Sequence, residues 1–220
     1  MPENMRSTDM FLCDEKTRKR YLDLGDPIMM LIEESQTEEH QNFTSQRWLT
    51  QSLEKRLVYW HVYGDLFEKE GLKIVDVGGG YCSLSDLLAQ RHDYLVVEVL
   101  AHDDKPTNVA CEQTDWNEFD CPDCDLVIAN DLFPNVDQRL ELFLQKFLPQ
   151  TRQMRLALTF YDNYKCYRVK RVDADEIFNI VAWDSIRLRR ALERHVVWDL
   201  PNNAPSIFPN GRQVCILNLP

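Results

Sequence analysis

The stretch KIVDVGGGYCS, residues 73–83, passes from a short apolar run directly into three consecutive glycines. The run Lys73–Val77 predicts a buried strand, because it is short, rich in β-branched residues and bounded by glycine. The segment that follows, Ser83–Arg91, has the pattern of a helix. Glycines between a strand and a helix allow a sharp turn and a close approach of the backbone to a ligand, and the helix N-terminus offers free N–H groups to that ligand.

Strand-like and helix-like segments continue to alternate after this turn. Further strands are expected at Tyr94–Val99, Thr107–Ala110, Asp125–Ala129 and Met154–Phe160, with a helix at Gln138–Phe147. Residues 175–195 are expected to be mostly helical, and late strands at Val196–Leu200 and Gln213–Leu219 are expected to form an antiparallel edge. The alternation predicts an α/β fold with a doubly wound, mostly parallel seven-stranded sheet and helices on both faces.

The first 71 residues have a different, more helical pattern. Lys16–Glu34 predicts one or two short helices, interrupted at the Gly-Asp-Pro sequence of residues 25–27. Apolar residues recur at three- and four-residue steps between Asn42 and Trp60, which indicates an amphipathic helix, and a second helical stretch, Leu66–Glu70, ends at Gly71. We therefore expect residues 1–71 to form a helical N-terminal lid on an α/β domain, residues 72–220, the two making one compact unit.

Composition narrows the classes of partner and compartment. The 220 residues include 25 Lys+Arg and 36 Asp+Glu, a formal net charge of −11. Such a chain is not drawn to nucleic acid or to an anionic membrane by charge alone, so neither partner is expected. No apolar run approaches the roughly 20 residues of a membrane-spanning helix, and the charged first residues do not resemble a secretion signal. An odd number of scattered cysteines, seven, is typical of free thiols in the cytoplasm.

Cys121 and Cys124, in the sequence CPDC, have the spacing of zinc ligands or of a redox pair. No second pair lies at a matching distance, and Cys111 is the one candidate for a third ligand. A loop that contains two thiols is the favoured interpretation, and no metal is expected.

An acidic residue, Glu98, ends the strand that follows the glycine turn. In open α/β sheets a carboxylate at this point can accept hydrogen bonds from both hydroxyls of a ribose. The simpler alternatives are that Glu98 is solvated and that Asp76 caps a turn, but the glycines and the acid in this order favour a nucleoside-containing ligand. A nicotinamide-binding fingerprint fits less well, because it requires glycine at position 83, which is Ser83.

Residues 72–160 resemble the class I (Rossmann-like) S-adenosylmethionine-dependent methyltransferases. The sequence KIVDVGGGYCSLS is similar to the first motif of that family, and VVEV to the second. The resemblance implies that S-adenosylmethionine is the cofactor and that Glu98 holds its ribose hydroxyls. It also implies that the methionine and ribose portions lie along Asp76, Gly78, Gly79 and Gly80.

Two further segments resemble later motifs of the same family. The sequence TDW is similar to the third, which implies that Asp115 meets the adenine amino group and that Trp116 covers the ring. The sequence CDLVIANDLFPNV is similar to the fourth, which implies that Ala129 and Asn130 lie beside the methionine end and Asp131 near the transferred methyl group. Position 82, usually the last glycine of the first motif, is Cys82 in this chain.

Two residues are candidates for a catalytic role. Asp131 is a candidate base or acceptor-orienting group, although an aspartate after a strand is also a good helix cap. His61, in the sequence YWHVYGD, could reach the site from the lid or could be a packing residue.

Candidate acceptor-binding residues come from the segment after the strand Met154–Phe160. Tyr161 and Asp162 lie where acceptors bind in this architecture, and a turn is the alternative. Arg168 belongs to the stretch YDNYKCYRVKR, in which tyrosines alternate with cations. Such a surface could hold a phosphate or a sugar, and a solvated edge is the favoured alternative.

These patterns together predict a methyltransferase that acts on a small-molecule or carbohydrate-like acceptor, with oxygen as the expected methylated atom. The alternative is a non-catalytic, methyltransferase-like binding protein, suggested by Cys82 and by the lack of histidine in LFPNV after Asp131. A pocket open at Gly78–Gly80 with Glu98 facing inward would favour the enzyme. A pocket closed by Tyr81 or Cys82 would favour the alternative. Self-association into a homo-oligomer is compatible with either.

Overall fold

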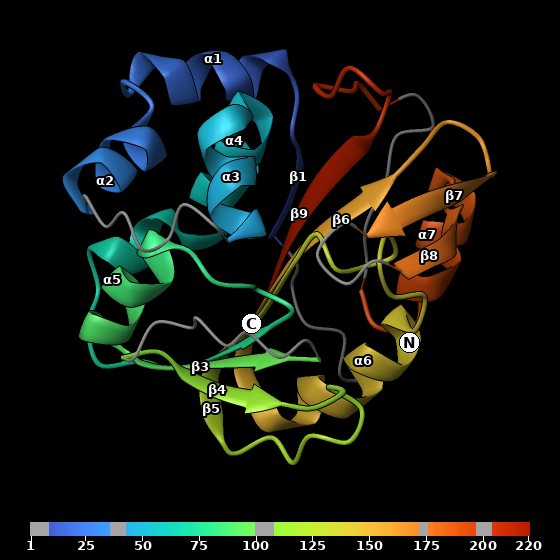
Figure 1. The fold of residues 1–220 in the computed structure, drawn as a ribbon. Coiled ribbons are helices and arrows are strands. Elements are labelled where there is room, and N and C mark those ends of the chain that lie inside the picture. The colour runs from blue at the N-terminus through green and yellow to red at the C-terminus, as the bar shows by residue number, and fades with distance from the viewer. Residues whose placement is uncertain (1–8, 36–42, 100–107, 172–175, 197–203) are drawn as a thin grey trace.

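The computed structural model describes residues 9–35, 43–99, 108–171, 176–196 and 204–220. A seven-stranded sheet with the strand order β1-β9-β6-β5-β2-β3-β4 forms its centre (Figure 1). The five strands β2 to β6 run parallel, and β9 pairs antiparallel with both β6 and β1. These strands are β1 (Asp9–Leu12), β2 (Lys73–Val77), β3 (Asp93–Glu98), β4 (Ala110–Gln113), β5 (Cys124–Asn130), β6 (Thr151–Phe160) and β9 (Gln213–Leu219).

Helices cover both faces of this sheet (Figure 1). One face carries α1 (Glu15–Asp23), α2 (Pro27–Ser35), α3 (Thr44–Gln51), α4 (Leu53–Tyr63), the 3₁₀ turn η2 (Gly64–Phe67) and α5 (Ser83–Arg91). The other face carries α6 (Leu140–Phe147), the 3₁₀ turn η3 (Leu148–Gln150) and α7 (Ser185–Leu192). The predicted α/β fold with a doubly wound, mostly parallel seven-stranded sheet is confirmed.

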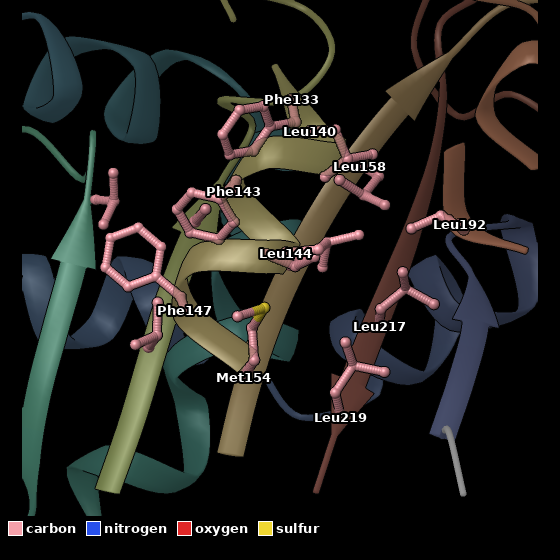
Figure 2. Packing of buried hydrophobic residues seen from close by; sticks show 14 of the residues in the cluster. Phe133, Leu140, Phe143, Leu144, Phe147, Met154, Leu158, Leu192, Leu217 and Leu219 are labelled. Carbon is pink, nitrogen blue, oxygen red and sulfur yellow. The ribbon is translucent and has the colours of Figure 1, made fainter. Parts of the chain in front are cut away.

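The apolar strands of the sequence are buried on both sides. In β5, Leu126 and Ile128 join the core under the helices α1–α5, whereas Val127 and Ala129 join the core under α6 and α7. Successive side chains of a strand point to opposite faces, so a continuous apolar run is what a sheet covered on both faces requires. Figure 2 shows the second core, in which residues of α6 pack over the strands; its labelled members include Phe143, Leu144, Phe147 and Leu217.

The seventh strand comes from an unexpected part of the sequence. The prediction placed it at Val196–Leu200, but Val196 lies in no strand and residues 197–200 fall outside the described part of the chain. Instead Asp9–Leu12 forms β1, which pairs with β9 at the edge of the sheet. Residues 9–71 therefore supply one strand of the sheet as well as the helices α1–α4. The division of the chain at residue 72 stays a prediction.

The expected helix over residues 175–195 is wrong in its first half. Glu176–Ala182 forms the strand β8, which pairs antiparallel with β7 (Lys165–Arg171) in a separate two-stranded sheet. The sequence EIFNIVA is rich in β-branched and aromatic residues, and pairing with β7 provides the context that favours a strand. The basic stretch singled out in the sequence thus forms one strand of a hairpin.

Other bounds also differ from the prediction, and the helical stretch expected at Leu66–Glu70 is the 3₁₀ turn η2 at Gly64–Phe67. The short strand expected at Thr107–Ala110 is observed at Ala110–Gln113, and Thr107 lies outside the described residues. The amphipathic stretch is divided at Ser52, whose extended backbone ends α3 and whose hydroxyl accepts a hydrogen bond from the backbone N–H of Lys55 at 3.2 Å. This cap starts α4 and places Lys55 in its first turn. In the described part of the chain, no helix is long and apolar enough to cross a membrane.

Candidate functional site

A cavity of about 420 Å³ lies at the edge of the sheet where β2, β3 and β5 end. Ligands of open α/β sheets bind at this carboxyl edge. The wall from the strand ends includes Gly78–Gly80, Glu98, Asn130 and Asp131. Side chains from the rest of the chain complete the lining, among them Phe43, Trp48, Lys55, Tyr59, Leu132, Thr159, Phe208 and Arg212.

The turn after β2 requires glycine at position 80 for two reasons. Its φ of +64° lies in the left-handed region, which side chains disfavour. A Cβ atom at this position would also lie 2.2 Å from the Oγ atom of Ser45, which belongs to α3 and lines the same cavity. The backbone at Gly80 is therefore packed closely under α3 at the cavity wall.

Asp76, the acidic residue of the first motif, lies beneath this turn. Its Oδ2 accepts hydrogen bonds from the hydroxyls of Tyr63 at 2.8 Å and Tyr94 at 2.5 Å. Burial raises the pKa of this carboxyl to about 6, against the lowering effect of the two hydrogen bonds. A Cβ atom on Gly79 would lie 2.5 Å from the carboxyl group. Asp76 thus supports the turn from below and is not part of the cavity lining, so its contact with a cofactor stays a prediction.

Glu98 and Asn130 are the predicted residues that present polar groups to the cavity. Glu98 ends β3, and its Oε1 accepts a hydrogen bond from the backbone N–H of Val99 at 2.9 Å. The Oδ1 atom of Asn130 is buried and has no hydrogen-bond partner among the described residues. Ala129, the preceding residue, is fully buried in the core under α6 and does not line the cavity. The arrangement can offer a carboxylate and an amide oxygen to a polar ligand.

Asp131 lies between two cations. Its backbone has a φ of +60°, and its carboxylate forms ion pairs with Lys55 Nζ and, at 2.9 Å, with Arg212 Nη1. Burial alone would raise the pKa of Asp131, but Lys55 and Arg212 outweigh burial and hold the pKa below its ordinary value. A carboxylate whose pKa is held below its ordinary value is a weak proton acceptor at neutral pH. The geometry therefore favours the orienting role over the role of a base.

Lys55 and Arg212 are the charged residues of the site that were not predicted from the sequence. Lys55 Nζ lies 5.0 Å from the ring centre of Trp48, and the Arg212 guanidinium lies 4.1 Å from that of Phe208. These cations come from α4 and from the loop before β9, far from Asp131 in sequence. No local pattern marks them, although a lysine just after a serine cap is a visible feature of residues 52–55.

Asp115 and Trp116 follow β4 and make their side-chain contacts with α6 and the segment before it. Asp115 pairs with Arg139 at 2.9 Å, and Trp116 Nε1 donates a hydrogen bond to Asp137 at 2.7 Å. The indole is 4% exposed and packs edge-on against Phe143, with ring centres 5.3 Å apart. Neither Asp115 nor Trp116 lines the cavity. The structure therefore places Trp116 in the core under α6, and contact of Asp115 or Trp116 with an adenine stays a prediction.

His61 does not reach this cavity either. It packs edge-on against Phe11, with ring centres 4.7 Å apart, and lines a second cavity together with Asp65 and Arg155. Burial lowers the pKa of its imidazole. Because α4 directs Lys55 and Tyr59 toward the first cavity and His61 toward the second, the predicted catalytic role for His61 has no support in the geometry.

The predicted acceptor-binding residues also lie outside the cavity lining. Tyr161 is buried, and its backbone forms an isolated bridge with that of Asp184. Asp162 accepts a hydrogen bond from Gln213 Nε2 at 2.5 Å, and Arg168 is exposed on β7. The contact of these three residues with an acceptor stays a prediction.

The cysteines are free thiols at all seven positions. Cys82 caps α5, and its Sγ lies 3.6 Å from Ser85 Oγ and 3.9 Å from the hydroxyl of Tyr59, outside the cavity lining. A hydrogen bond from Cys121 lowers the pKa of Cys124 to about 7. Within the described ranges, no group of three or more His, Cys, Asp or Glu side chains is arranged to hold a metal ion.

No protein-family model and no curated protein sequence matches this chain significantly. Solved structures do match its fold. The N-terminal domain of EvdMO1 with SAH bound superposes with a TM-score of 0.50 at 14% sequence identity, over 73% of this chain and 79% of that chain. The 1,6-didemethyltoxoflavin-N1-methyltransferase of Burkholderia thailandensis, with bound 1,6-didemethyltoxoflavin and S-adenosylhomocysteine, gives a TM-score of 0.50 at 11% identity, over 100% of this chain and 96% of that chain. The chain has the fold of S-adenosylmethionine-dependent methyltransferases.

Proposed function

We propose that this protein is an S-adenosylmethionine-dependent methyltransferase that acts on a small-molecule acceptor. One observation carries the proposal: the glycine turn after β2 and the acid that ends β3 line the same cavity, at the carboxyl edge of a sheet with the methyltransferase fold. When bound, S-adenosylmethionine supplies a methyl group on a positively charged sulfur. Residues of the chain must bind it, exclude water and align an acceptor.

The residues present fit such a cofactor. Glu98 would accept hydrogen bonds from the two ribose hydroxyls, as acids at this strand end can do. The unpaired Oδ1 of Asn130 would accept a hydrogen bond from the methionine ammonium group. The backbone of Gly78–Gly80 would lie along the cofactor without an intervening Cβ atom. For Asp76 we propose support of the turn from below, and for Asp115 and Trp116 a structural role.

The acceptor is proposed to be a small or carbohydrate-like molecule methylated at oxygen. A cavity of about 420 Å³ is within the size range of small-molecule sites, roughly 300–1,000 Å³. Thr159 Oγ1 is buried in its wall and has no hydrogen-bond partner among the described residues, so it could bind an acceptor hydroxyl. Asp131 would orient the acceptor through Lys55 and Arg212, because positioning alone can supply much of the rate of a displacement.

The alternative of a non-catalytic relative has less support. Cys82, one of the two departures that suggested it, is turned toward Ser85 and Tyr59, and Gly78–Gly80 line the cavity. A cytoplasmic location is proposed from the free thiols and the charge of −11, and the same charge argues against a nucleic-acid acceptor.

Calorimetric titration with S-adenosylmethionine and S-adenosylhomocysteine tests the proposal. Wild type is expected to bind both, and Glu98→Ala is expected to bind at least tenfold more weakly, which corresponds to about 1.4 kcal/mol. Glu112→Ala is the matched control, because Glu112 is an exposed acid on the neighbouring strand β4, outside the cavity. No binding to wild type at millimolar ligand would refute the proposal. An equal loss in both variants would refute the role of Glu98.

A further inference from the structure

The described cavity lining is neutral as a whole, with two cations and two carboxylates, but its charges are unevenly placed, because both cations lie around Asp131. Among the described lining residues, the charged ones are Lys55, Glu98, Asp131 and Arg212. Glu98 ends β3, on the side of the sheet assigned above to the ribose. Lys55 and Arg212 share the single carboxylate of Asp131. One positive charge at this end is therefore left without a counter-ion inside the described lining.

The sheet topology separates Arg212 from the proposed cofactor groups. Because β9 is antiparallel to β6, the residue just before β9 lies at the same edge as the carboxyl ends of the parallel strands. In the order β9-β6-β5-β2, Arg212 and the glycine turn lie three strand spacings apart. With roughly 4.8 Å between neighbouring strands, the separation is about 14 Å. A cofactor on β2 and β3 would leave the end at β6 and β9 for the acceptor.

Arg212 is buried in the cavity wall, as a ligand-binding residue would be, and is not a solvated surface arginine. Its side chain is 9% exposed, and Nη1 donates to the two carboxylate oxygens of Asp131 at 2.9 and 3.3 Å. The guanidinium lies over the ring of Phe208, and its Nε is buried with no hydrogen-bond partner in the described part of the chain. Arginine has five N–H donors in a planar fork that suits carboxylates and phosphates. A buried cation with an N–H group that makes no hydrogen bond costs free energy unless a partner accepts from that group.

From these contacts we infer that the methyl acceptor is an anion, whose carboxylate or phosphate group binds Arg212 with Lys55 beside it. The inference rests on the proposed function. The apolar body of the acceptor would lie between Phe208 and Trp48, which lines the cavity and is 55% exposed. Asp131 would keep both cations in place before the acceptor arrives.

Paired probes in complex with S-adenosylhomocysteine test this inference. We would titrate a panel of hydroxylated aromatic and aliphatic carboxylic acids, their neutral carboxamides and their phosphate-ester counterparts, beginning with 4-hydroxybenzoate and 4-hydroxybenzamide. At least one acid or phosphate is expected to bind wild type tenfold or more tightly than its amide. Preference for carboxylates over phosphates, or the reverse, identifies the anion.

Two variants distinguish anion binding at Arg212 from a general effect of the charge of the protein. Arg212→Gln is expected to lose the preference for the anion and to keep S-adenosylhomocysteine binding, which also reports that it folds. Arg152→Gln, which removes the same charge from a side chain 84% exposed at the start of β6, is expected to keep the preference.

Two outcomes would overturn the inference. The first is a panel in which no anion binds wild type better than its amide, and the second is an equal loss in Arg212→Gln and Arg152→Gln. Either result with intact S-adenosylhomocysteine binding would leave the proposed cofactor site standing. Failure of S-adenosylhomocysteine to bind wild type would instead refute the proposed function.

Discussion

In the ligand-free protein, the unfolding free energy of Asp76→Asn relative to that of wild type should rise as the pH rises from 4 to 7. Asp76 is 1% exposed, and burial raises the pKa of its carboxyl from 3.8 to about 6. Between these pH values the folded chain holds a proton that the unfolded chain has released. Stability is therefore lost as the pH rises through this window, the opposite of the usual behaviour of a paired aspartate.

The size of the effect follows from the shift in pKa. One pKa unit corresponds to about 1.4 kcal/mol, so a shift of about two units makes ionised Asp76 cost about 3 kcal/mol at pH 7. Asparagine keeps an oxygen that can accept hydrogen bonds from Tyr63 and Tyr94 but carries no charge. Its amide also introduces a buried N–H donor, which lowers the unfolding free energy of the variant by about 1–3 kcal/mol at every pH. The difference in unfolding free energy between variant and wild type should therefore rise by about 2–3 kcal/mol between pH 4 and 7.

Urea unfolding at pH 4, 5, 6 and 7 measures this difference directly. Asp65→Asn is a control whose difference from wild type should stay nearly constant between pH 4 and 7. Burial would raise the pKa of Asp65, but hydrogen bonds from Arg155 and Lys69 outweigh burial and lower it to about 2. Its contribution to stability is present above pH 4 and is lost as the pH falls toward 2. A difference for Asp76→Asn that stays flat, or falls as the pH rises, would refute the reasoning.

Three further changes test the turn, the third motif and the core. Gly80→Ala adds a Cβ atom 2.2 Å from Ser45 Oγ at positive φ, so calorimetry should show at least tenfold weaker S-adenosylhomocysteine binding. The control Gly71→Ala has a similar φ but no atom within 4 Å of the added Cβ, and it should leave binding unchanged. Trp116→Phe should lower the unfolding free energy by about 1–3 kcal/mol without changing that affinity, and tenfold weaker binding would mean that the indole reaches the ligand. Phe143→Ala should cost about 3–5 kcal/mol in urea unfolding, and a loss below about 1 kcal/mol would contradict its place in the core.

The strand, the glycine turn and the following helix were predictable because their signals are local. Lys73–Val77 and Ser83–Arg91 are observed with the predicted bounds. Glu98 follows the next strand, and parallel strands bring their carboxyl ends to one edge, so its place in the cavity wall was also predictable. Hydrophobic period and glycine placement act over a few residues, which is the range that a sequence pattern records.

Residues whose roles depend on distant partners could not be assigned in this way. Asp131 is a reasonable base in isolation, but Lys55 lies 76 positions earlier and Arg212 lies 81 positions later, and both lower its pKa. Trp116 follows its motif, yet its indole joins the core under α6. Burial and ion pairing are properties of the folded neighbourhood, which a motif within one stretch of sequence does not contain.

The sequence by itself determined the α/β architecture, the glycine turn and the acid at the end of β3, because backbone conformation and hydrophobic period are encoded locally. Only the tertiary structure decided that Asp9–Leu12 completes the sheet, that His61 faces away from the cavity, and that Lys55 and Arg212 enclose Asp131. The physical reason is that strand pairing at an edge, the face of a helix that meets a cavity, and the field at a carboxylate all depend on groups brought together from distant parts of the chain.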